Sequence, residues 1–299
     1  MLTVFNQVMM LFLFALVGFA LSRSQILKPE HAQMLSALEV YVFLPCTIVK
    51  TFSANFSVEY LTQKYAILLI GIVILTCVIL LSLAAARLFS KEVYERNVFI
   101  YSLIVPNMGY MGYALAEALY GSGTLLNVMI FGLPLNFFTY TAGYCLLTRK
   151  KLSFKNLINP VMIAVVCGCI LGLSGLQIPT IATNALETGS ACMAPISMIL
   201  AGITISEFKF KELLGDIRMY IVTLLRLLII PAAITLVLKA CGAHEVALLA
   251  VLAYAMPCGL NTIVFPKLIG EDCRIGASLA LLSNVGACLT IPICLYLFA

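Results

Sequence analysis

Charged residues are scarce in this chain. Asp, Glu, Lys and Arg make up 10% of its 299 residues, tryptophan is absent, and histidine occurs twice. A soluble domain carries about 25% charged residues, so a soluble globular fold is excluded. Hydrophobic residues reach 63% and the mean hydropathy is +1.09, which indicates a membrane protein that crosses the lipid bilayer several times.

The rarity of histidine and of clustered acids excludes most catalytic chemistry. His31 and His244 fall in predicted connections, and no pair of carboxylates is evident at membrane depth. An intramembrane enzyme needs an acid–base pair, a nucleophile or a metal set there, so we predict no enzymatic activity. Cys167 and Cys169 stand one residue apart with no histidine nearby, so we expect no metal and no cofactor.

No segment is long enough to form a soluble domain, and no Walker motif is present. These two absences exclude an ATP-driven pump and a receptor with its own signalling domain. They also leave no soluble surface on which a nucleic acid could bind.

Long apolar runs are abundant, and a spanning helix needs about 20 such residues. The pattern predicts an all-α integral membrane protein with ten transmembrane helices. The predicted spans are 4–21, 32–52, 64–88, 95–119, 125–148, 157–175, 184–205, 217–238, 245–269 and 275–298.

The basic residues predict the orientation of these spans. Fourteen of the 18 Lys and Arg residues fall in odd-numbered connections, and three fall in even-numbered connections or tails. Basic connections face the cytoplasm. We therefore expect a cell-membrane protein with both termini outside and with the link Arg149–Lys155 in the cytoplasm.

Two predicted spans are interrupted by helix-breaking residues. Span 4 contains Pro106, followed by Asn107, Gly109 and Tyr110, and span 9 contains Pro257, followed by Gly259 and Asn261. Proline removes a backbone N–H and glycine weakens a helix, so a new half-helix begins inside the bilayer at each place. Interrupted spans at matching positions in two halves of a chain are typical of a transporter's binding site.

The same features recur in both halves of the chain, which we place at residues 1–151 and 152–299. Leu44-Pro45 in span 2 matches Ala194-Pro195 in span 7, and Asn136 in span 5 matches Asn284 in span 10. Five spans is an odd number, so the second half must cross the membrane in the opposite sense. The sequence therefore predicts a 5+5 inverted repeat.

The segment from Pro106 to Gly112, continued by Tyr120-Gly121, resembles the fourth span of the auxin efflux carrier family, which includes plant PIN proteins and bacterial organic-acid carriers. The segment from Met256 to Asn261 looks like the ninth span of its bacterial members. Leu44-Pro45, Asn159-Pro160 and the segment from Ala194 to Gly202 are similar to its second, sixth and seventh spans.

This resemblance implies that broken helices 4 and 9 cross. It implies a scaffold of helices 1, 2, 6 and 7, a moving transport block of helices 3–5 and 8–10, and a homodimer. It also implies substrate contact at Asn107 and Asn261.

The two breaks predict an anion site. Each half-helix carries a partial positive charge at its N-terminus, where free N–H groups can hold a carboxylate. We predict that the substrate-binding residues are Pro106, Asn107, Gly109, Tyr110, Pro257, Gly259, Asn261 and Arg226. The two asparagines could instead only cap their half-helices.

Other polar residues lie deep in predicted spans and leave alternatives open. Arg226 could attract the anion, pair with Glu39 or Glu117, or extend to the interface. Glu39 could carry a proton or a cation, or lie near the interface. Asn136 and Asn284 could line an ion site or bond between helices.

The sequence thus favours a secondary transporter of small organic anions that works by elevator-like alternating access, driven by H⁺ or Na⁺ or by neither. The alternatives are a sodium-coupled bile-acid-type symporter and a cation/proton antiporter, although an antiporter should carry acids at the crossing. Gly168 and Gly172 in span 6 form a GxxxG pattern, which predicts tight packing inside one chain rather than a dimer contact.

Overall fold

The structure is a computed structural model that describes residues 2–28, 30–151, 159–176, 178–209, 213–267 and 269–298. The described residues form helices and connecting segments, and their β-type pairing is limited to an isolated bridge. The α-helices are α1 (Leu2–Arg23), α2 (Glu30–Leu38), α3 (Leu44–Asn55), α4 (Val58–Phe89), α5 (Val93–Ile104), α6 (Tyr113–Phe138), α7 (Tyr144–Thr148), α8 (Pro160–Ser174), α9 (Thr180–Ser206), α11 (Ile217–Leu224), α12 (Ile230–Ala240), α13 (His244–Tyr254), α14 (Asn261–Lys267) and α15 (Arg274–Phe298). The π-helical turns are η1 (Glu39–Phe43), η2 (Met108–Gly112), η3 (Thr139–Gly143) and η5 (Leu225–Ile229).

The predicted all-helical membrane protein is confirmed in this coarse form. In the described part, seven helical stretches are long and apolar enough to cross a bilayer, and one of them, Met108–Thr148, contains two helices that meet at a kink at Gly121, where φ is 82°. They are Leu2–Arg23, Glu30–Asn55, Val58–Phe89, Met108–Thr148, Thr180–Ser206, Ile217–Ala240 and Arg274–Phe298. The count of ten spans stays a prediction. Residues 152–158, which include Lys155 of the basic link and the start of the predicted span 157–175, lie outside the described residues.

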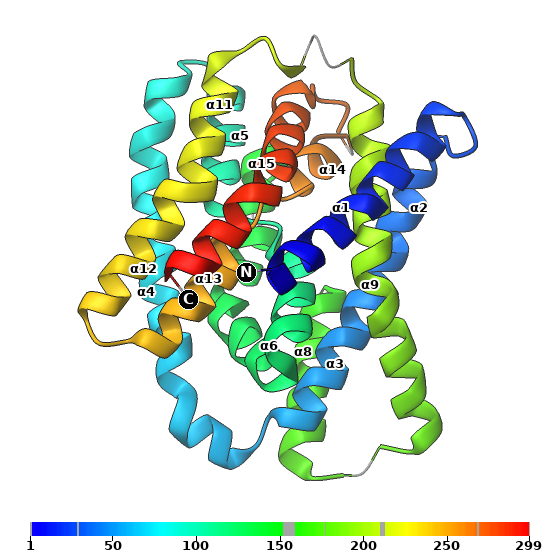
Figure 1. The fold of residues 1–299 in the computed structure, drawn as a ribbon, viewed down its shortest axis with the longest axis vertical. Coiled ribbons are helices and arrows are strands. Elements are labelled where there is room, and N and C mark those ends of the chain that lie inside the picture. Colours follow the sequence, from blue (N-terminus) through cyan, green and yellow to red (C-terminus); the bar gives the residue numbers. More distant parts are fainter. Residues whose placement is uncertain are drawn as a thin grey trace.

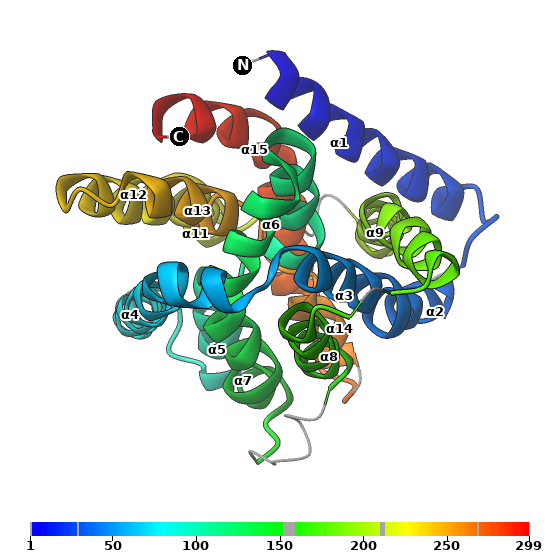
Figure 2. The same ribbon diagram turned by 90° about the horizontal axis from the view of Figure 1, so that it is seen from below.

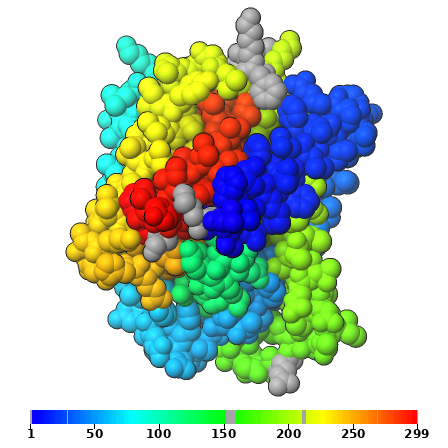
Figure 3. All heavy atoms as spheres, viewed as in Figure 1, coloured from blue at the N-terminus to red at the C-terminus, as the bar shows by residue number. Residues whose placement is uncertain are grey.

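The helices gather into two groups (Figures 1 and 2). The α9 group consists of α1, α2, α3, α8 and α9, and it lies on the right in Figure 2. Its main contacts are between α1 and α9 and between α3 and α8. The α15 group consists of α4 to α7 and α11 to α15, where α4 packs on α5 and α6, and α11 packs on α15. In the space-filling view α1 and α15 cover the seam between the groups on one face (Figure 3).

Glycines allow close contacts between helices of the α9 group. A Cβ atom on Gly172 of α8 would lie 2.3 Å from the Phe56 carbonyl oxygen, and one on Gly168 would lie 2.6 Å from the Cβ of Phe52. Both neighbours belong to the α3 side of the chain. The prediction that this GxxxG pattern packs inside the chain is therefore confirmed.

Among the residues that the structure describes, two ion pairs join the groups. Lys50 of α3 bonds to Glu117 of α6 at 2.5 Å, and Lys267 of α14 bonds to Glu207, directly after α9. In Figure 1, α3 and the start of α6 lie in the lower half, whereas α14 and the end of α9 lie in the upper half. Among the described residues, the other ion pairs that connect different elements lie within the α15 group. The expectation that Glu117 could pair with Arg226 is wrong, because Glu117 is paired with Lys50.

Capping fixes the start of α11. The Asp216 carboxylate accepts a hydrogen bond from the Arg218 backbone N–H at 2.9 Å, and the Arg218 guanidinium bonds to the same carboxylate. The hydrogen bond from Arg218 holds the pKa of Asp216 below its usual value.

Candidate functional site

Both predicted interruptions are present. α5 ends at Ile104 and the chain becomes helical again at Met108. α13 ends at Tyr254, and α14 begins at Asn261. Neither half-helix passes through its proline, because Pro106 and its counterpart offer no N–H to continue the ladder.

The two interruptions also meet. The Asn107 N–H donates a hydrogen bond to the Pro257 carbonyl at 2.7 Å, and the Gly259 N–H donates to the Val105 carbonyl at 3.3 Å. The two segments run antiparallel at this bridge. The pairing satisfies backbone groups that the broken helices leave free, which is essential away from water.

A cavity of about 40 Å³ lies beside this junction. Its lining residues come from both the α9 group and the α15 group. In the described part, none of the lining side chains is charged. Its lining residues are Leu44, Val105, Pro106, Asn107, Met108, Gly109, Tyr110, Tyr113, Leu135, Asn136, Thr139, Tyr140, Val161, Gly259, Leu260 and Asn261. Since one water needs about 10–15 Å³ by this measure, the cavity has room for roughly three waters.

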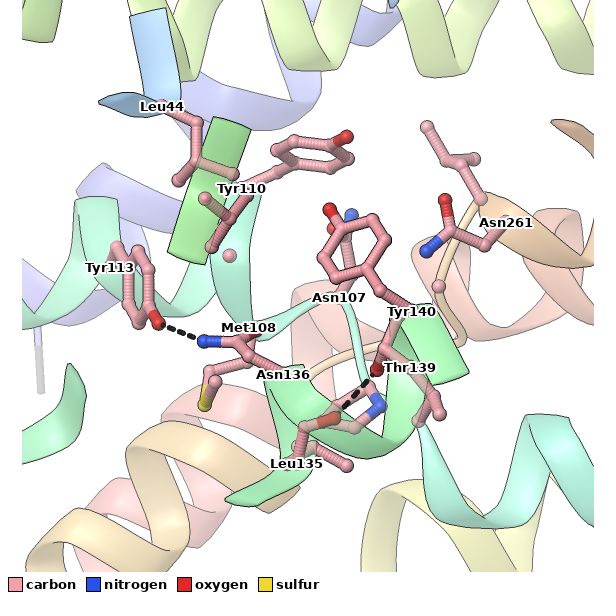
Figure 4. A pocket seen from close by; sticks show the side chains of 16 residues that line it. Leu44, Asn107, Met108, Tyr110, Tyr113, Leu135, Asn136, Thr139, Tyr140 and Asn261 are labelled. Carbon is pink, nitrogen blue, oxygen red and sulfur yellow. Dashed lines mark hydrogen bonds between the residues drawn. The ribbon is translucent and has the colours of Figure 1, made fainter. Parts of the chain in front are cut away.

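Hydrogen-bond donors without partners face this cavity. The Asn107 side chain is 3% exposed, and its Nδ2 has no partner among the described residues. Within the described residues, the backbone N–H groups of Met108, Gly109 and Tyr110 also have no carbonyl partner. Figure 4 shows the Asn107 and Asn261 amides and the Tyr110 hydroxyl gathered on one side of the cavity. A ligand that accepts hydrogen bonds would satisfy these donors.

The opposite wall comes from α6 and η3. The Asn136 Nδ2 donates to the Tyr113 hydroxyl at 3.0 Å, and the Thr139 hydroxyl donates to the Leu135 carbonyl at 2.8 Å (Figure 4). Sequence reasoning selected Asn136 but missed Tyr113, Thr139 and Tyr140. The signal that could have found them is the mixture of hydroxyl-bearing side chains within an apolar span.

Each π-helical turn of the described residues carries a polar or ionisable side chain that is buried or lines the cavity. Glu39 begins η1, Tyr110 lies in η2, Tyr140 lies in η3, and Arg226 lies in η5. A π-turn adds a residue to the helix and redirects the side chains around it, and such turns are frequent at functional sites.

Arg226 lies away from the cavity, at the ends of the preceding half-helices. It is completely buried. Its Nη1 donates to the carbonyl of Leu103, in the last turn of α5, at 3.2 Å. Its guanidinium lies 5.7 Å from the ring centre of Tyr254, the last residue of α13. The C-terminal end of a helix is partly negative, so this cation balances two such ends.

The remaining predicted residues lie outside the cavity lining. Pro257 contributes its carbonyl to the junction, and the Asn284 Nδ2 donates to the Ala280 carbonyl of its own helix at 2.8 Å. Glu39 is completely buried, and neither carboxylate oxygen has a partner within the described residues. The suggested pairing of Glu39 with Arg226 is therefore wrong.

The structure thus brings together six of the eight predicted substrate residues, namely Pro106, Asn107, Gly109, Tyr110, Gly259 and Asn261. Of the three predicted coupling residues, Asn136 joins them. Their role in binding stays a prediction.

Known proteins resemble this chain over nearly its whole length. The model of a family described as membrane transport protein matches twice, over residues 3–155 and 145–295. The uncharacterized transporter YfdV of Escherichia coli strain K12 is 25% identical over 296 residues, covering 94% of this chain and 93% of that protein. The uncharacterized transporter MJ1031 of Methanocaldococcus jannaschii is 25% identical over 302 residues, covering 96% of each.

Proposed function

Because this chain belongs to the membrane transport protein family, we propose that it is a secondary transporter of small organic anions. The family match confirms the resemblance to the auxin efflux carriers. The family and the two relatives indicate a transporter rather than an enzyme.

The cavity at the helix junction carries the proposal. It offers the unpaired Asn107 amide, the free N–H groups at the start of η2 and the Asn261 amide, with no charged side chain among its described lining. Amide and backbone donors suit a carboxylate, and the N-terminus of the helix that runs on from η2 adds partial positive charge. Uncharged donors also let the anion leave again.

The size and lining of the cavity favour this substrate class over the two alternatives. A cation/proton antiporter needs a carboxylate that binds its cation, and none is among the lining residues in the described part of the chain. A cavity of about 40 Å³ must widen even for a small dicarboxylate, and it is far smaller than a bile acid.

The proposed mechanism is elevator-like alternating access. The α9 group corresponds to predicted helices 1, 2, 6 and 7, and the α15 group to predicted helices 3–5 and 8–10. In this proposal the α9 group is the scaffold and the α15 group moves past it with the anion. The recurrence of Pro106 and Pro257, and of Asn136 and Asn284, in the two halves of the sequence supports an inverted repeat.

The proposal includes a homodimer in the cell membrane with both termini outside. A fusion of alkaline phosphatase to the C-terminus should be active, because this enzyme folds only outside the cytoplasm. Mass photometry of the detergent-purified protein should give twice the chain mass of 32.5 kDa plus the detergent.

Counterflow in proteoliposomes tests the function. Vesicles loaded with unlabelled malonate should accumulate ¹⁴C-malonate, and Asn107→Ala and Asn261→Ala should each lower that exchange at least tenfold. Asn184→Ala is the matched control, because Asn184 is an exposed residue of α9, and it should exchange at the wild-type rate. Full exchange by both cavity variants, or accumulation of cations alone across a panel of carboxylates and cations, would contradict the proposal.

A further inference from the structure

Glu39 is a carboxylate that the anion site does not use. It is completely buried, and both its oxygens lack a hydrogen-bond donor among the described residues. It is the first residue of the π-turn η1, directly after the end of the α-helix α2 at Leu38. Pro45 follows the turn and has no N–H to offer the carbonyl four residues earlier, which loosens the helix at this place.

Among the described residues, no charged side chain of the elements around η1 is paired with Glu39. η1 packs against α2, α3, α8 and α9. The ionisable groups of η1 and these helices are Glu30, His31, Tyr41, Lys50 and Glu187, together with the thiols of Cys46, Cys167, Cys169 and Cys192. Lys50 is bonded to Glu117, and Tyr41 and Glu187 are exposed.

Glu39 lies next to the cavity wall. Tyr110 and Tyr140 are within electrostatic range of its carboxylate, and both line the cavity. Leu44, which directly follows η1, lines the cavity as well. The charge state of Glu39 therefore acts on an anion in the cavity.

A bare charge in this position is strongly unfavourable, so the carboxylate needs a bound proton or a cation. A metal cation prefers several oxygen ligands. Within the described residues there is no group of three or more His, Cys, Asp or Glu side chains that could hold a metal ion, so a metal cation here would depend on backbone carbonyl or hydroxyl oxygens. A proton needs only the carboxylate itself, and it makes the group neutral.

We propose that Glu39 binds a proton that is carried together with the organic anion, which makes the protein a proton-coupled symporter. This inference rests on the proposed function. An ionised Glu39 repels an anion in the neighbouring cavity and a protonated Glu39 does not, so the anion and the proton favour each other's binding. Linkage requires that this preference be reciprocal.

The test uses full-length protein in proton-tight proteoliposomes that contain the pH dye pyranine. With the lumen at pH 7.5 and the outside at pH 6.0, wild-type protein should accumulate ¹⁴C-malonate and acidify the lumen. Glu39→Gln keeps the shape of the protonated acid, so it should still exchange malonate at equal pH. It should lose at least tenfold in gradient-driven accumulation and should not acidify the lumen.

Two further variants separate coupling from folding. Glu187→Gln removes an exposed carboxylate of α9 and should remain fully coupled. Glu39→Asp retains a carboxylate and should acidify the lumen, even if Glu39→Gln does not fold.

The outcomes distinguish the two proposals. Accumulation and acidification by Glu39→Gln at the wild-type rate would overturn the role of Glu39, since the proton would then travel on the anion or on another group. Exchange of malonate by wild-type protein without any acidification would overturn the coupling alone. Wild-type protein that moves no carboxylate at any pH would overturn the anion transporter and the coupling together.

Discussion

A methyl group added at Gly172 should destabilise the protein measurably. In Gly172→Ala the new Cβ would lie 2.3 Å from the Phe56 carbonyl oxygen and 2.7 Å from that of Phe52. An ordinary contact begins near 3.4 Å, so α8 and α3 must separate by about 1 Å. Both oxygens belong to the backbone and cannot rotate away. Overpacking of this kind costs about 1–3 kcal/mol.

The measurement is thermal unfolding of detergent-purified protein, followed by circular dichroism at 222 nm because the chain has no tryptophan. At roughly 2–4 °C per kcal/mol, the value for chains of 150–250 residues, the midpoint should fall by several degrees. Gly123→Ala is the control. Gly123 is an exposed position at the start of the helix that follows the kink at Gly121, and a Cβ there meets nothing within 4 Å, so this variant should not lose stability.

An unchanged or raised midpoint for Gly172→Ala, alongside an unchanged or raised midpoint for Gly123→Ala, would refute the reasoning. It would mean that α8 does not approach α3 as closely as these distances state. A fall in both variants would instead point to a general sensitivity of the fold to added methyl groups.

Two further predictions concern charge. Arg226→Ala should abolish malonate exchange while folded protein remains in the membrane, because the ends of α5 and α13 lose the cation that balances them. Exchange is measured in the same proteoliposomes, and a normal rate would remove Arg226 from the mechanism. Asp216→Asn keeps the N-capping oxygen but removes the charge, so it should cost about 0.3–1 kcal/mol, the usual value of a carboxylate at a helix N-terminus, as measured by the same thermal unfolding. Because folding lowers the pKa of Asp216, the stabilisation by Asp216 is present above the ordinary aspartate pKa near 4 and is lost as the pH falls through the folded value. The difference between wild type and Asp216→Asn should therefore shrink below pH 4, and a difference that stays constant with pH would contradict the charge argument.

The helix breaks could be predicted because their causes are local. Pro106 and Pro257 lack the N–H that a continuous helix requires, and that is a property of the residue itself. The cavity residues next to these prolines, such as Asn107 and Asn261, followed from the same reasoning. The contact between the breaks came from the resemblance to a family, since nothing local specifies which distant segment will pair with Val105.

The other half of the site depends on tertiary packing and could not be predicted. Tyr140 reaches the cavity because η3 adds a residue to its helix, and the sequence does not specify where a helix takes on a π-turn. The depth of Arg226 was evident, but its partners were not. Arg226 binds the backbone carbonyl of Leu103. Every residue has such a carbonyl, and only the fold determines which carbonyl is free to accept a hydrogen bond from Arg226.

The ion pairs at the two ends of the group boundary have a mechanical consequence. In one pair the lysine belongs to the α9 group, as Lys50, and in the other it belongs to the α15 group, as Lys267. Sliding one group past the other by a single helical turn, about 5.4 Å, would separate both pairs at once. Partly exposed pairs of this kind contribute only about 0–1 kcal/mol each, which is close to thermal energy. The two lysines can therefore define where the groups come to rest without making that position difficult to leave.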